Sequence, residues 1–235
     1  MDPPSISVIV PTLNEEKYIT NTLLSIKQQE YNGKCEIVVA DGMSSDRTTE
    51  IARRFADKVI KVTRKGVSAG RNEGAKAAEG EIYVFLDGDT IAYKNLLSNI
   101  AKDFKNKKVL AGTPRILTTA FGKTLILYHV ANELGINTLF KLKKPILPAV
   151  CLACRKEAFW QIGGFNEELK VAEDVDFSSK IRKLDGKFVY MRHTYVYTSP
   201  RRLESWGIVK QLRAWPFGYI WIRLKHRQPR YEPIR

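Results

Sequence analysis

The stretch Ile82-Tyr83-Val84-Phe85-Leu86-Asp87-Gly88-Asp89 decides the fold, because an apolar run ends here in two carboxylates. Five consecutive aliphatic and aromatic residues predict a strand that is buried on both faces. Gly88 is expected to let the backbone turn sharply between the acids. Two neighbouring carboxylates repel each other unless a cation neutralises them, and such oxygen ligands suit Mg²⁺ or Mn²⁺, which also hold a diphosphate. An isolated Asp-Gly-Asp is more often a polar strand-to-loop corner, so the metal hypothesis depends on the rest of the chain.

Outward from this stretch, strands and helices alternate through the first half of the chain. This alternation predicts an α/β fold with a mostly parallel central sheet of the Rossmann type, flanked by helices on both faces. Strands are expected at 6–10, 36–40, 59–62 and 82–86, with helices opening at Asn14, Arg47 and Ser68. In such a sheet ligands bind beyond the carboxyl ends of the strands. Three polar loops follow strands directly and are therefore expected to meet on one rim: 11–15, 41–46 and 87–89.

The second half is less regular. A helix is expected at 96–104, strands at 109–112 and 149–154, and a further helix from Ala172 to about Leu184, whose early acids suit the positive helix end. Two separate strands are expected at 188–191 and 195–198. The segment 116–140 is apolar with scattered polar residues, which predicts a helical cover or a wall beside the site.

Composition narrows the class of protein. The 235 residues with 44% hydrophobic content suit one domain, with or without an appendage. No run of about 18 apolar residues is present, so no ordinary membrane span is expected. The start Met1-Asp2-Pro3-Pro4 has no basic leader, which predicts a cytoplasmic protein. Cys151 and Cys154 form a C-x-x-C without a second ligand pair, so we expect buried core cysteines rather than a zinc or redox site.

The net charge of +14 attracts polyanions, whether nucleic acid, anionic lipid or a phosphorylated substrate. Many of these cations lie among Trp, Tyr and Phe in a basic aromatic C-terminal extension, residues 201–235. Such a mixture suits a segment in the interface of an anionic membrane. We therefore expect a cytoplasmic chain that is peripheral at the cytoplasmic face of the membrane, or else a tail that packs on the domain.

The order of the motifs resembles that of the family-2 glycosyltransferases, which are inverting enzymes with the GT-A fold. The matching stretches run from residue 5 to about 200 and are 7–16, 36–48, 70–74, 84–90, 163–165 and 173–176. The resemblance implies a GT-A domain at 1–200, with a nucleotide-binding half at about 1–112 and an acceptor half at about 113–200. Residues 201–235 would be the tail.

The resemblance also implies a nucleotide-sugar donor. Asp41 would hydrogen-bond the base, while Pro11, Leu13 and Glu15 would line the base and ribose pocket. Arg71 would approach the base or the diphosphate, and Asp87 and Asp89 would hold Mn²⁺ or Mg²⁺ with that diphosphate. Each has a structural alternative: a turn cap for Asp41, a helix start for Glu15 and a surface helix position for Arg71.

On the acceptor side, Asp174 would match the general base of the family, and Glu173 would orient the acceptor or raise the pKa of Asp174. These acids could instead only stabilise a helix start. Arg201 and Arg202 would grip a diphosphate or form a solvated basic turn. His193 would complete the metal shell or, as a lone histidine, be structural.

Two departures from the family pattern bear on specificity. Ala40 stands where the family commonly has a first aspartate, which predicts a looser or different recognition of the base. The Q-x-x-R-W of processive synthases is absent, which predicts a non-processive enzyme. The acceptor would be a glycan, a small molecule or a polyprenyl-type lipid phosphate.

Two other functions remain open from the residues. A sugar nucleotidyltransferase shares the chemistry of a metal held by carboxylates. A basic nucleic-acid-binding module would use the cations and aromatic rings of the tail, although the acidic rim would repel nucleic acid, so we expect no nucleic-acid partner. A dinucleotide-dependent oxidoreductase is a weaker alternative, because the first strand-to-helix turn lacks G-x-G-x-x-G.

Overall fold

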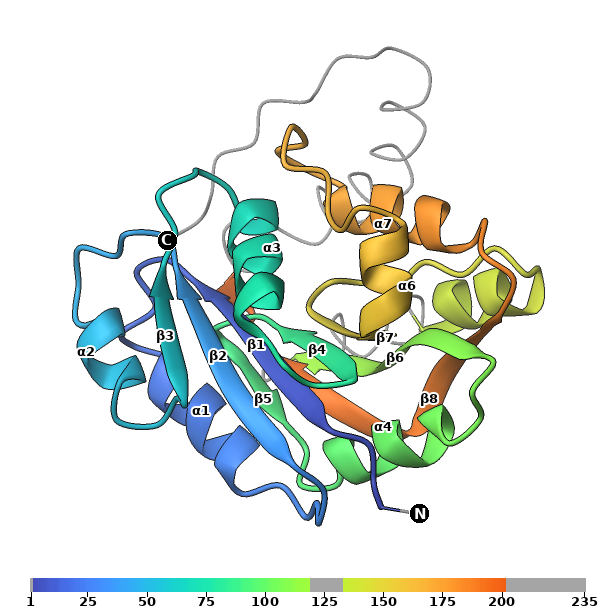
Figure 1. Ribbon diagram of the computed structural model, residues 1–235, viewed down its shortest axis with the longest axis horizontal. Coiled ribbons are helices and arrows are strands. Elements are labelled where there is room, and N and C mark those ends of the chain that lie inside the picture. The colour runs from blue at the N-terminus through green and yellow to red at the C-terminus, as the bar shows by residue number, and fades with distance from the viewer. Residues whose placement is uncertain (1, 119–132, 202–235) are drawn as a thin grey trace.

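The computed structural model describes residues 2–118 and 133–201, whose strands form one eight-stranded sheet (Figure 1). The strands are β1 (Ile6–Thr12), β2 (Cys35–Asp41), β3 (Lys58–Lys61), β4 (Ile82–Leu86), β5 (Thr90–Ala92), β6 (Val109–Thr118), β7 (Cys151–Arg155) and β8 (Lys187–Thr198). The helices include α1 (Ile19–Lys27), α2 (Thr48–Ala52), α3 (Val67–Ala77), α4 (Leu96–Phe104), α6 (Lys156–Gln161) and α7 (Glu173–Ile181). Residues 133–141 are also helical, as expected for a helical cover within 116–140.

The sheet has the order β3-β2-β1-β4-β7-β6-β8-β5. Strands β1 to β4 pair in parallel, as the alternation of strands and helices predicts. Beyond β4 the sheet is mixed, because β7 is antiparallel to both β4 and β6, β8 is parallel to β6, and β5 is antiparallel to β8. The predicted α/β fold with helices on both faces is confirmed, and the parallel part is its first half.

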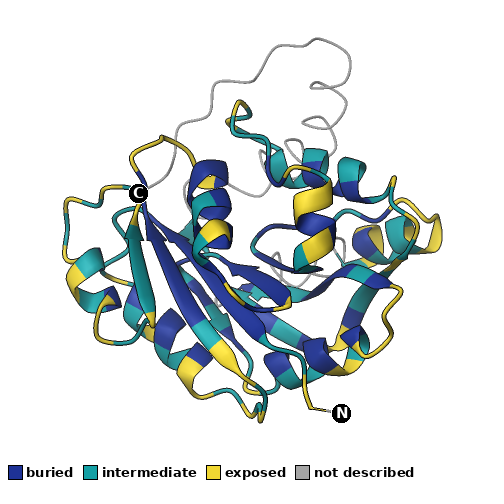
Figure 2. Ribbon diagram, in the orientation of Figure 1, coloured by how far each residue is buried: buried dark blue, intermediate teal, exposed yellow. Residues whose placement is uncertain are grey.

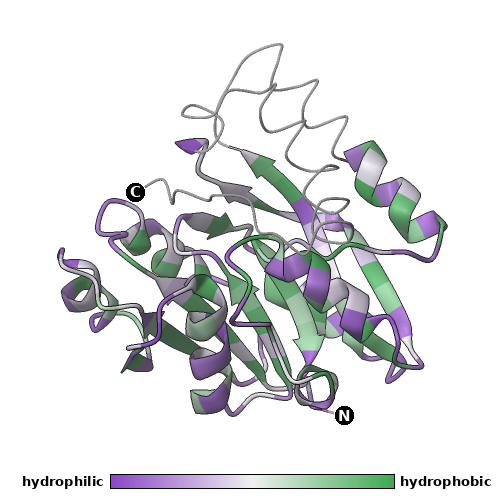
Figure 3. Ribbon diagram, turned by 90° about the horizontal axis from the view of Figure 1, so that it is seen from above, coloured by the Kyte–Doolittle hydropathy of each residue, from purple (hydrophilic) through white to green (hydrophobic). Residues whose placement is uncertain are grey.

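Both faces of the sheet are covered by apolar packing. Along β1, Val8 and Val10 belong to the cluster that includes α1 and α4, whereas Ile9 belongs to the cluster with α3, α6 and α7. A strand alternates its side chains between two faces, so a continuous apolar run is what two covered faces require. The central strands are accordingly almost wholly buried (Figure 2), and hydrophobic residues concentrate on them (Figure 3).

Two expectations near the first loop are wrong. β1 does not end before Pro11 but continues to Thr12, since pairing with β4 has already stopped at Ile9 and the missing N–H of Pro11 costs no bond there. The first helix begins at Ile19 rather than at Asn14. The backbone N–H groups of Asn14 and Glu15 instead donate to Ser44 and Thr48 of the next loop.

Other boundaries also differ from the expectation. The sequence missed β5 and α6, and the two strands expected at 188–191 and 195–198 are one strand, β8. β6 runs to Thr118, beyond the end of the strand expected at 109–112.

Cys151 and Cys154 are buried core residues of β7, as expected, and burial raises the pKa of both thiols. The expectations for Arg202 and the rest of the tail, and for much of 116–140, lie outside the described residues. In the part of the chain that the structure describes, no helix is long and apolar enough to cross a membrane.

Candidate active site

The loops that follow β1 and β2 are tied together at the carboxyl ends of these strands. The backbone N–H of Gly42 donates to the carbonyl of Thr12 over 2.8 Å, and the Thr12 hydroxyl donates to Asp41 over 3.1 Å. The Glu15 N–H donates to the Thr48 hydroxyl over 2.7 Å. Three of the non-glycine residues with positive φ lie at the rim, namely Asn14, Met43 and Ala172. Such strained backbone is retained mainly at functional sites.

Asp41 is buried and serves its own loop in this state. Its carboxylate accepts hydrogen bonds from the Thr12 hydroxyl and from both the hydroxyl and the backbone N–H of Ser44. The geometry is that of the turn cap that the sequence left as the alternative to base recognition. Pro11 is buried below α3, where a Cβ on Gly70 would come within 3.2 Å of it, while Leu13 is partly exposed on the rim.

The loop after β4 lies against the loop after β1. A Cβ on Gly88 would come within 3.2 Å of the side chains of Glu15 and Thr12, so a larger residue here would make one of them shift. The expected turn is present, since the Thr90 N–H donates to the Asp87 carbonyl over 3.0 Å, but Gly88 is not among the glycines with positive φ, so the turn by itself does not demand glycine. This close contact brings Glu15 to the same corner as Asp87 and Asp89.

Asp87 and Asp89 are held by different arginines. Asp87 binds Arg71 of α3 at 2.9 Å, and the other end of the same guanidinium binds Glu173 of α7 at 2.8 Å. Asp89 binds Arg201 at 2.6 Å, and Arg201 also binds Glu15 at 3.0 Å. We call these the Arg71 cluster (Arg71, Asp87, Glu173) and the Arg201 cluster (Arg201, Asp89, Glu15).

The Arg71 cluster borders the candidate base. Asp174 follows Glu173 at the start of α7 and accepts a hydrogen bond from the Val175 N–H over 2.8 Å. Burial, followed by the negative charge of Glu173, raises the pKa of Asp174 to about 7, and Arg71 opposes this rise. A carboxylate with such a pKa accepts a proton efficiently at neutral pH.

The Arg201 cluster lies where β8 ends. The Arg201 guanidinium stacks 4.5 Å above the ring of Tyr18. Burial raises the pKa of Glu15, and although Arg201 opposes this, the negative charges of Asp89 and Asp87 add to the rise. One buried oxygen of Glu15, Oε2, has no hydrogen-bond partner among the residues that the structure describes. Tyr18 was missed from the sequence, because only the fold brings it beneath Arg201.

These residues fit a divalent cation. Asp87 and Asp89 supply hard oxygen ligands, and Arg201 shows that Asp89 and Glu15 together attract a cation. Within residues 2–118 and 133–201, no group of three or more His, Cys, Asp or Glu side chains is arranged to hold a metal. A Mg²⁺-type site needs only one or two carboxylates, completed by water and substrate phosphates. His193 is not part of this corner through any described contact, and its imidazole lies 3.7 Å from Asp103 of α4.

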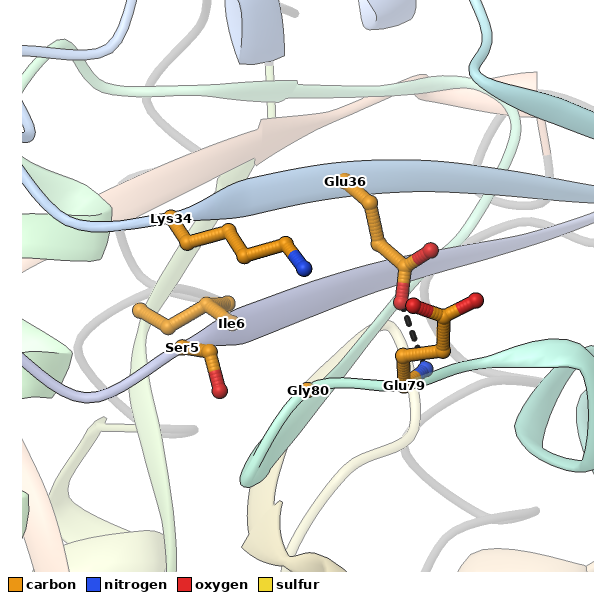
Figure 4. A pocket seen from close by; sticks show the side chains of 6 residues that line it. All are labelled: Ser5, Ile6, Lys34, Glu36, Glu79 and Gly80. Carbon is orange, nitrogen blue, oxygen red and sulfur yellow. Dashed lines mark hydrogen bonds between the residues drawn. The ribbon is translucent and has the colours of Figure 1, made fainter.

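A small cavity of about 30 Å³ lies at the opposite, amino-terminal end of the sheet (Figure 4). There the Glu79 N–H donates to Glu36 over 2.6 Å, and Glu36 also accepts a hydrogen bond from Ser7. A space of this size holds water rather than a ligand. We therefore place the candidate site at the carboxyl-end rim.

Residues 7–163 match the family model described as glycosyl transferase family 2. The chain belongs to this family. The resemblance stated from the motifs is thereby confirmed, and the protein is a glycosyltransferase.

The relatives of this family-2 glycosyltransferase act on different substrates. It is 28% identical over 233 residues to the O-antigen chain rhamnosyltransferase WbaN of Salmonella anatum, covering 90% of this chain and 74% of WbaN. It is 39% identical over 192 residues to the poly(ribitol-phosphate) beta-N-acetylglucosaminyltransferase TarS of Staphylococcus aureus, covering 74% of this chain. The chain spans only 32% of the length of TarS.

Solved structures confirm the GT-A fold. The crystal structure of TarS 1–349 in complex with UDP has a TM-score of 0.66 at 25% identity and covers 86% of this chain and 62% of that one. The mannosyltransferase PcManGT from Pyrobaculum calidifontis, in complex with GDP-Man and Mn²⁺, has a TM-score of 0.72 at 23% identity. That match covers 97% of this chain and 67% of PcManGT.

Proposed function

We propose that this chain moves a sugar from a nucleoside-diphosphate sugar to an acceptor by a metal-assisted, inverting and non-processive displacement. The observation that carries the proposal is that Arg71 joins Asp87, at the end of β4, to Glu173, beside Asp174. The candidate metal ligand and the candidate base therefore belong to one connected group of charges. Family membership favours this chemistry over nucleotidyl transfer or nucleic-acid binding.

The donor base is proposed to lie against Pro11, Leu13 and Asp41. Position 40 cannot take part in the way that a first aspartate would, because Ala40 is 1% exposed and its methyl lies under α3, 3.4 Å from where a Cβ of Gly74 would be. Recognition of the base by a carboxylate would thus depend on Asp41, whose oxygens also accept hydrogen bonds from Thr12 and Ser44. TarS is known with UDP and PcManGT with GDP-Man, so the fold accommodates more than one base.

The diphosphate is proposed to lie beside Asp89 and Asp87, with Mn²⁺ or Mg²⁺ held between these carboxylates and the phosphate oxygens. Bound there, the cation would offset the negative charge that grows on the leaving nucleoside diphosphate. Glu15 borders this position through Arg201. Arg201 and Arg202 would then bind phosphate oxygens, as guanidinium groups do with bidentate geometry.

Asp174 is proposed to accept the proton of the acceptor hydroxyl as that oxygen attacks the anomeric carbon. Its pKa near 7 suits this role. Glu173 would hold it in place through Arg71. If the acceptor is a lipid phosphate, which already carries negative charge, the need for Asp174 is smaller.

The acceptor is proposed to be a glycan, a small molecule or a polyprenyl-type lipid, bound by the half that follows about residue 113. We also propose that the tail 201–235 places the enzyme at the cytoplasmic face of an anionic membrane. Binding to phosphatidylglycerol vesicles should weaken with salt. Binding that is equally strong to neutral vesicles, or absent from both, would contradict the membrane proposal.

The decisive experiment is a donor screen. Uridine, guanosine and thymidine diphosphate sugars are incubated with the chain and Mn²⁺ or Mg²⁺, and released nucleotide is identified by chromatography. Release of a nucleoside diphosphate with inversion at the sugar supports the proposal. Release of pyrophosphate indicates a nucleotidyltransferase instead.

A further inference from the structure

Arg71 is the most deeply buried charge of the candidate site. The residue is 2% exposed and lies within α3, where its guanidinium contacts Asp87 and Glu173 and lies 3.4 Å from the carbonyl of Ala149. It also stacks 5.2 Å above the ring of Phe165. The Nε of Arg71 has no hydrogen-bond partner among the described residues, but the side chain is enclosed by protein and presents no exposed face to a nucleotide.

The next residue fixes this arrangement from a second side. Asn72 donates to the carbonyl of Phe165 over 2.9 Å and accepts from its N–H over 3.0 Å. Gly164 has φ of +69°, and a Cβ there would come within 2.7 Å of the Asn72 side chain. These bonds fix the turn that carries Phe165 against α3. They thereby fix the position of Arg71, which contacts both Phe165 and Glu173 of α7.

Charge balance makes the position of Arg71 consequential. One guanidinium serves Asp87 and Glu173 directly, and Asp174 lies next to Glu173. The Asp174 carboxyl is hydrogen-bonded by the N–H groups of Val175 and Ala149, and Ala149 is also the residue whose carbonyl lies at Arg71. A buried cation shared by several acids affects the charge of each of them, because screening by water is weak there.

We propose that Arg71 is a positioning residue, which couples the metal-side carboxylate Asp87 to the acceptor-side pair Glu173 and Asp174, and is not a nucleotide ligand. This inference rests on the proposed function of the site. It replaces the role in binding the base or diphosphate that the family resemblance implies for Arg71. A change in the charge of Asp87 then alters the protonation of Asp174 through Arg71, which contacts neither acceptor nor donor.

The direct test measures the protonation of Asp174 in the full chain by carboxyl-carbon NMR of ¹³C-labelled aspartate, with Asp174→Asn used to assign the signal. The groups that face Asp174 are Glu173 on its own helix, Arg71 on α3 and, through Arg71, Asp87 after β4. Arg71→Met should raise the pKa of Asp174 by about one unit or more. Arg71→Lys should restore part of the difference. The matched control is Arg64→Met, which removes an exposed arginine bound to Glu73 and Glu167 and should leave Asp174 unchanged.

A second variant covers the case in which Arg71→Met does not fold. Asp87→Asn releases Arg71 from one acid and should lower the pKa of Asp174. In the Arg71→Met background, if it folds, the same change should have a smaller effect. An Asp174 titration that does not respond to Asp87→Asn would overturn the coupling.

Kinetics separate positioning from nucleotide binding. With an active donor identified, Arg71→Lys should reduce kcat and shift the acid limb of the pH profile while the KM for donor changes less than about threefold. A tenfold rise in that KM with an unshifted profile would make Arg71 a nucleotide ligand and contradict the inference. If the wild-type chain transfers no sugar, the proposed function fails, whereas the NMR titration still decides the role of Arg71.

Discussion

Asp87 and Asp89 belong to one loop, yet the Arg71 cluster and the Arg201 cluster are built differently. In the Arg71 cluster the arginine side chain is 3% exposed, comes from the interior of a helix and is stacked on Phe165. In the Arg201 cluster it is 18% exposed, follows the end of β8 and rests on Tyr18. We therefore expect the same ion-pair chemistry to form a fixed internal link at Arg71 and a contact that a ligand replaces at Arg201.

The two clusters also differ in what their loss would do. Removing one partner of a buried ion pair leaves an uncompensated charge and costs about 3–5 kcal/mol. Only the arginine of the Arg201 cluster is nearer to solvent, at 18% exposed against 3% for Arg71, whereas the carboxylates of the two clusters are similarly buried. We therefore expect Arg201 to leave its carboxylates at a lower cost than Arg71. The comparison thus predicts that changes in the Arg71 cluster alter stability and protonation, whereas changes in the Arg201 cluster alter binding.

The largest expected effect is that of Asp89→Ala, which removes the carboxylate of the exchangeable cluster. If Asp89 holds the metal-diphosphate as proposed, turnover should be abolished, while the melting temperature stays within a few degrees of wild type. Nucleoside diphosphate release and thermal unfolding check the two parts. Asp57→Ala is the matched control, since Asp57 pairs with Lys27 away from the rim, and it should retain turnover. An active Asp89→Ala enzyme would remove the basis for a metal at Asp89.

Asp174→Asn, beside the buried cluster, should slow transfer by about 10²–10⁴-fold. Asparagine keeps the shape of the side chain but cannot accept the proton, so donor affinity should stay largely intact. Steady-state kinetics and calorimetric titration of a nucleoside diphosphate with Mn²⁺ separate the two quantities. Full activity would refute the role of Asp174 as base, and weakened donor binding would place it in the donor site instead.

The extent to which the sequence predicted this molecule depends on the distance over which each signal acts. The strands β2, β3 and β4 and the helix α4 follow from local apolar patterns, and their predicted bounds differ by a residue or less at each end. The delayed start of α1 could not be predicted, because it depends on bonds from Asn14 and Glu15 to Ser44 and Thr48, some 30 residues away. Backbone donors that find tertiary partners have no need of a helix.

The site shows the same division. The polar loops that directly follow the strands predicted that Asp87 and Asp89 share a rim with Glu15. The partners of the acids were not predictable, since Arg71 meets Glu173 across 102 residues and Arg201 meets Glu15 across 186. The family resemblance implied that Arg71 approaches the nucleotide, and a helical arginine gives no local sign that it is buried. The stretch Gly70-Arg71-Asn72 gives a partial signal, since small and polar residues within an otherwise packed helix indicate a close contact.

Lowering the pH should reduce the rate of sugar transfer by protonating Asp174, which lies beside the buried Arg71 cluster. Asp174, with its pKa near 7, must be ionised to act as a base, and at pH 5 only about one molecule in 100 is ionised. With a hydroxyl acceptor, kcat should therefore fall about 100-fold between pH 8 and pH 5. The free energy of unfolding should change in the opposite direction. In the folded protein Asp174 has a pKa of about 7, whereas an ordinary aspartate has a pKa of 3.8, so the folded state binds the proton more tightly than the unfolded state. Protonation of Asp174 therefore stabilises the fold as the pH falls from 7 towards 4. Asp174→Asn should lose both dependences.

The smallest expected effect is that of Arg201→Met on metal binding. Arg201 neutralises Asp89 at 2.6 Å and Glu15 at 3.0 Å, so in the absence of donor it competes with a divalent cation for the same carboxylates. Removing its charge should tighten Mn²⁺ binding to the donor-free chain by about tenfold, which corresponds to about 1.4 kcal/mol. Methionine is expected to keep the packing against Tyr18, so that the variant removes only the positive charge of Arg201.

Mn²⁺ binding is measured by the electron paramagnetic resonance signal of the free ion, without donor or acceptor, so the result is independent of turnover. Arg71→Lys is the informative contrast, because it keeps the positive charge beside Asp87 and should leave Mn²⁺ affinity nearly unchanged. Unaltered affinity in Arg201→Met would mean that Arg201 and the metal do not compete, and the Arg201 cluster would then be as fixed as the Arg71 cluster. Tighter Mn²⁺ binding together with a higher KM for donor would instead give Arg201 two successive partners, Asp89 before the donor arrives and the diphosphate afterwards.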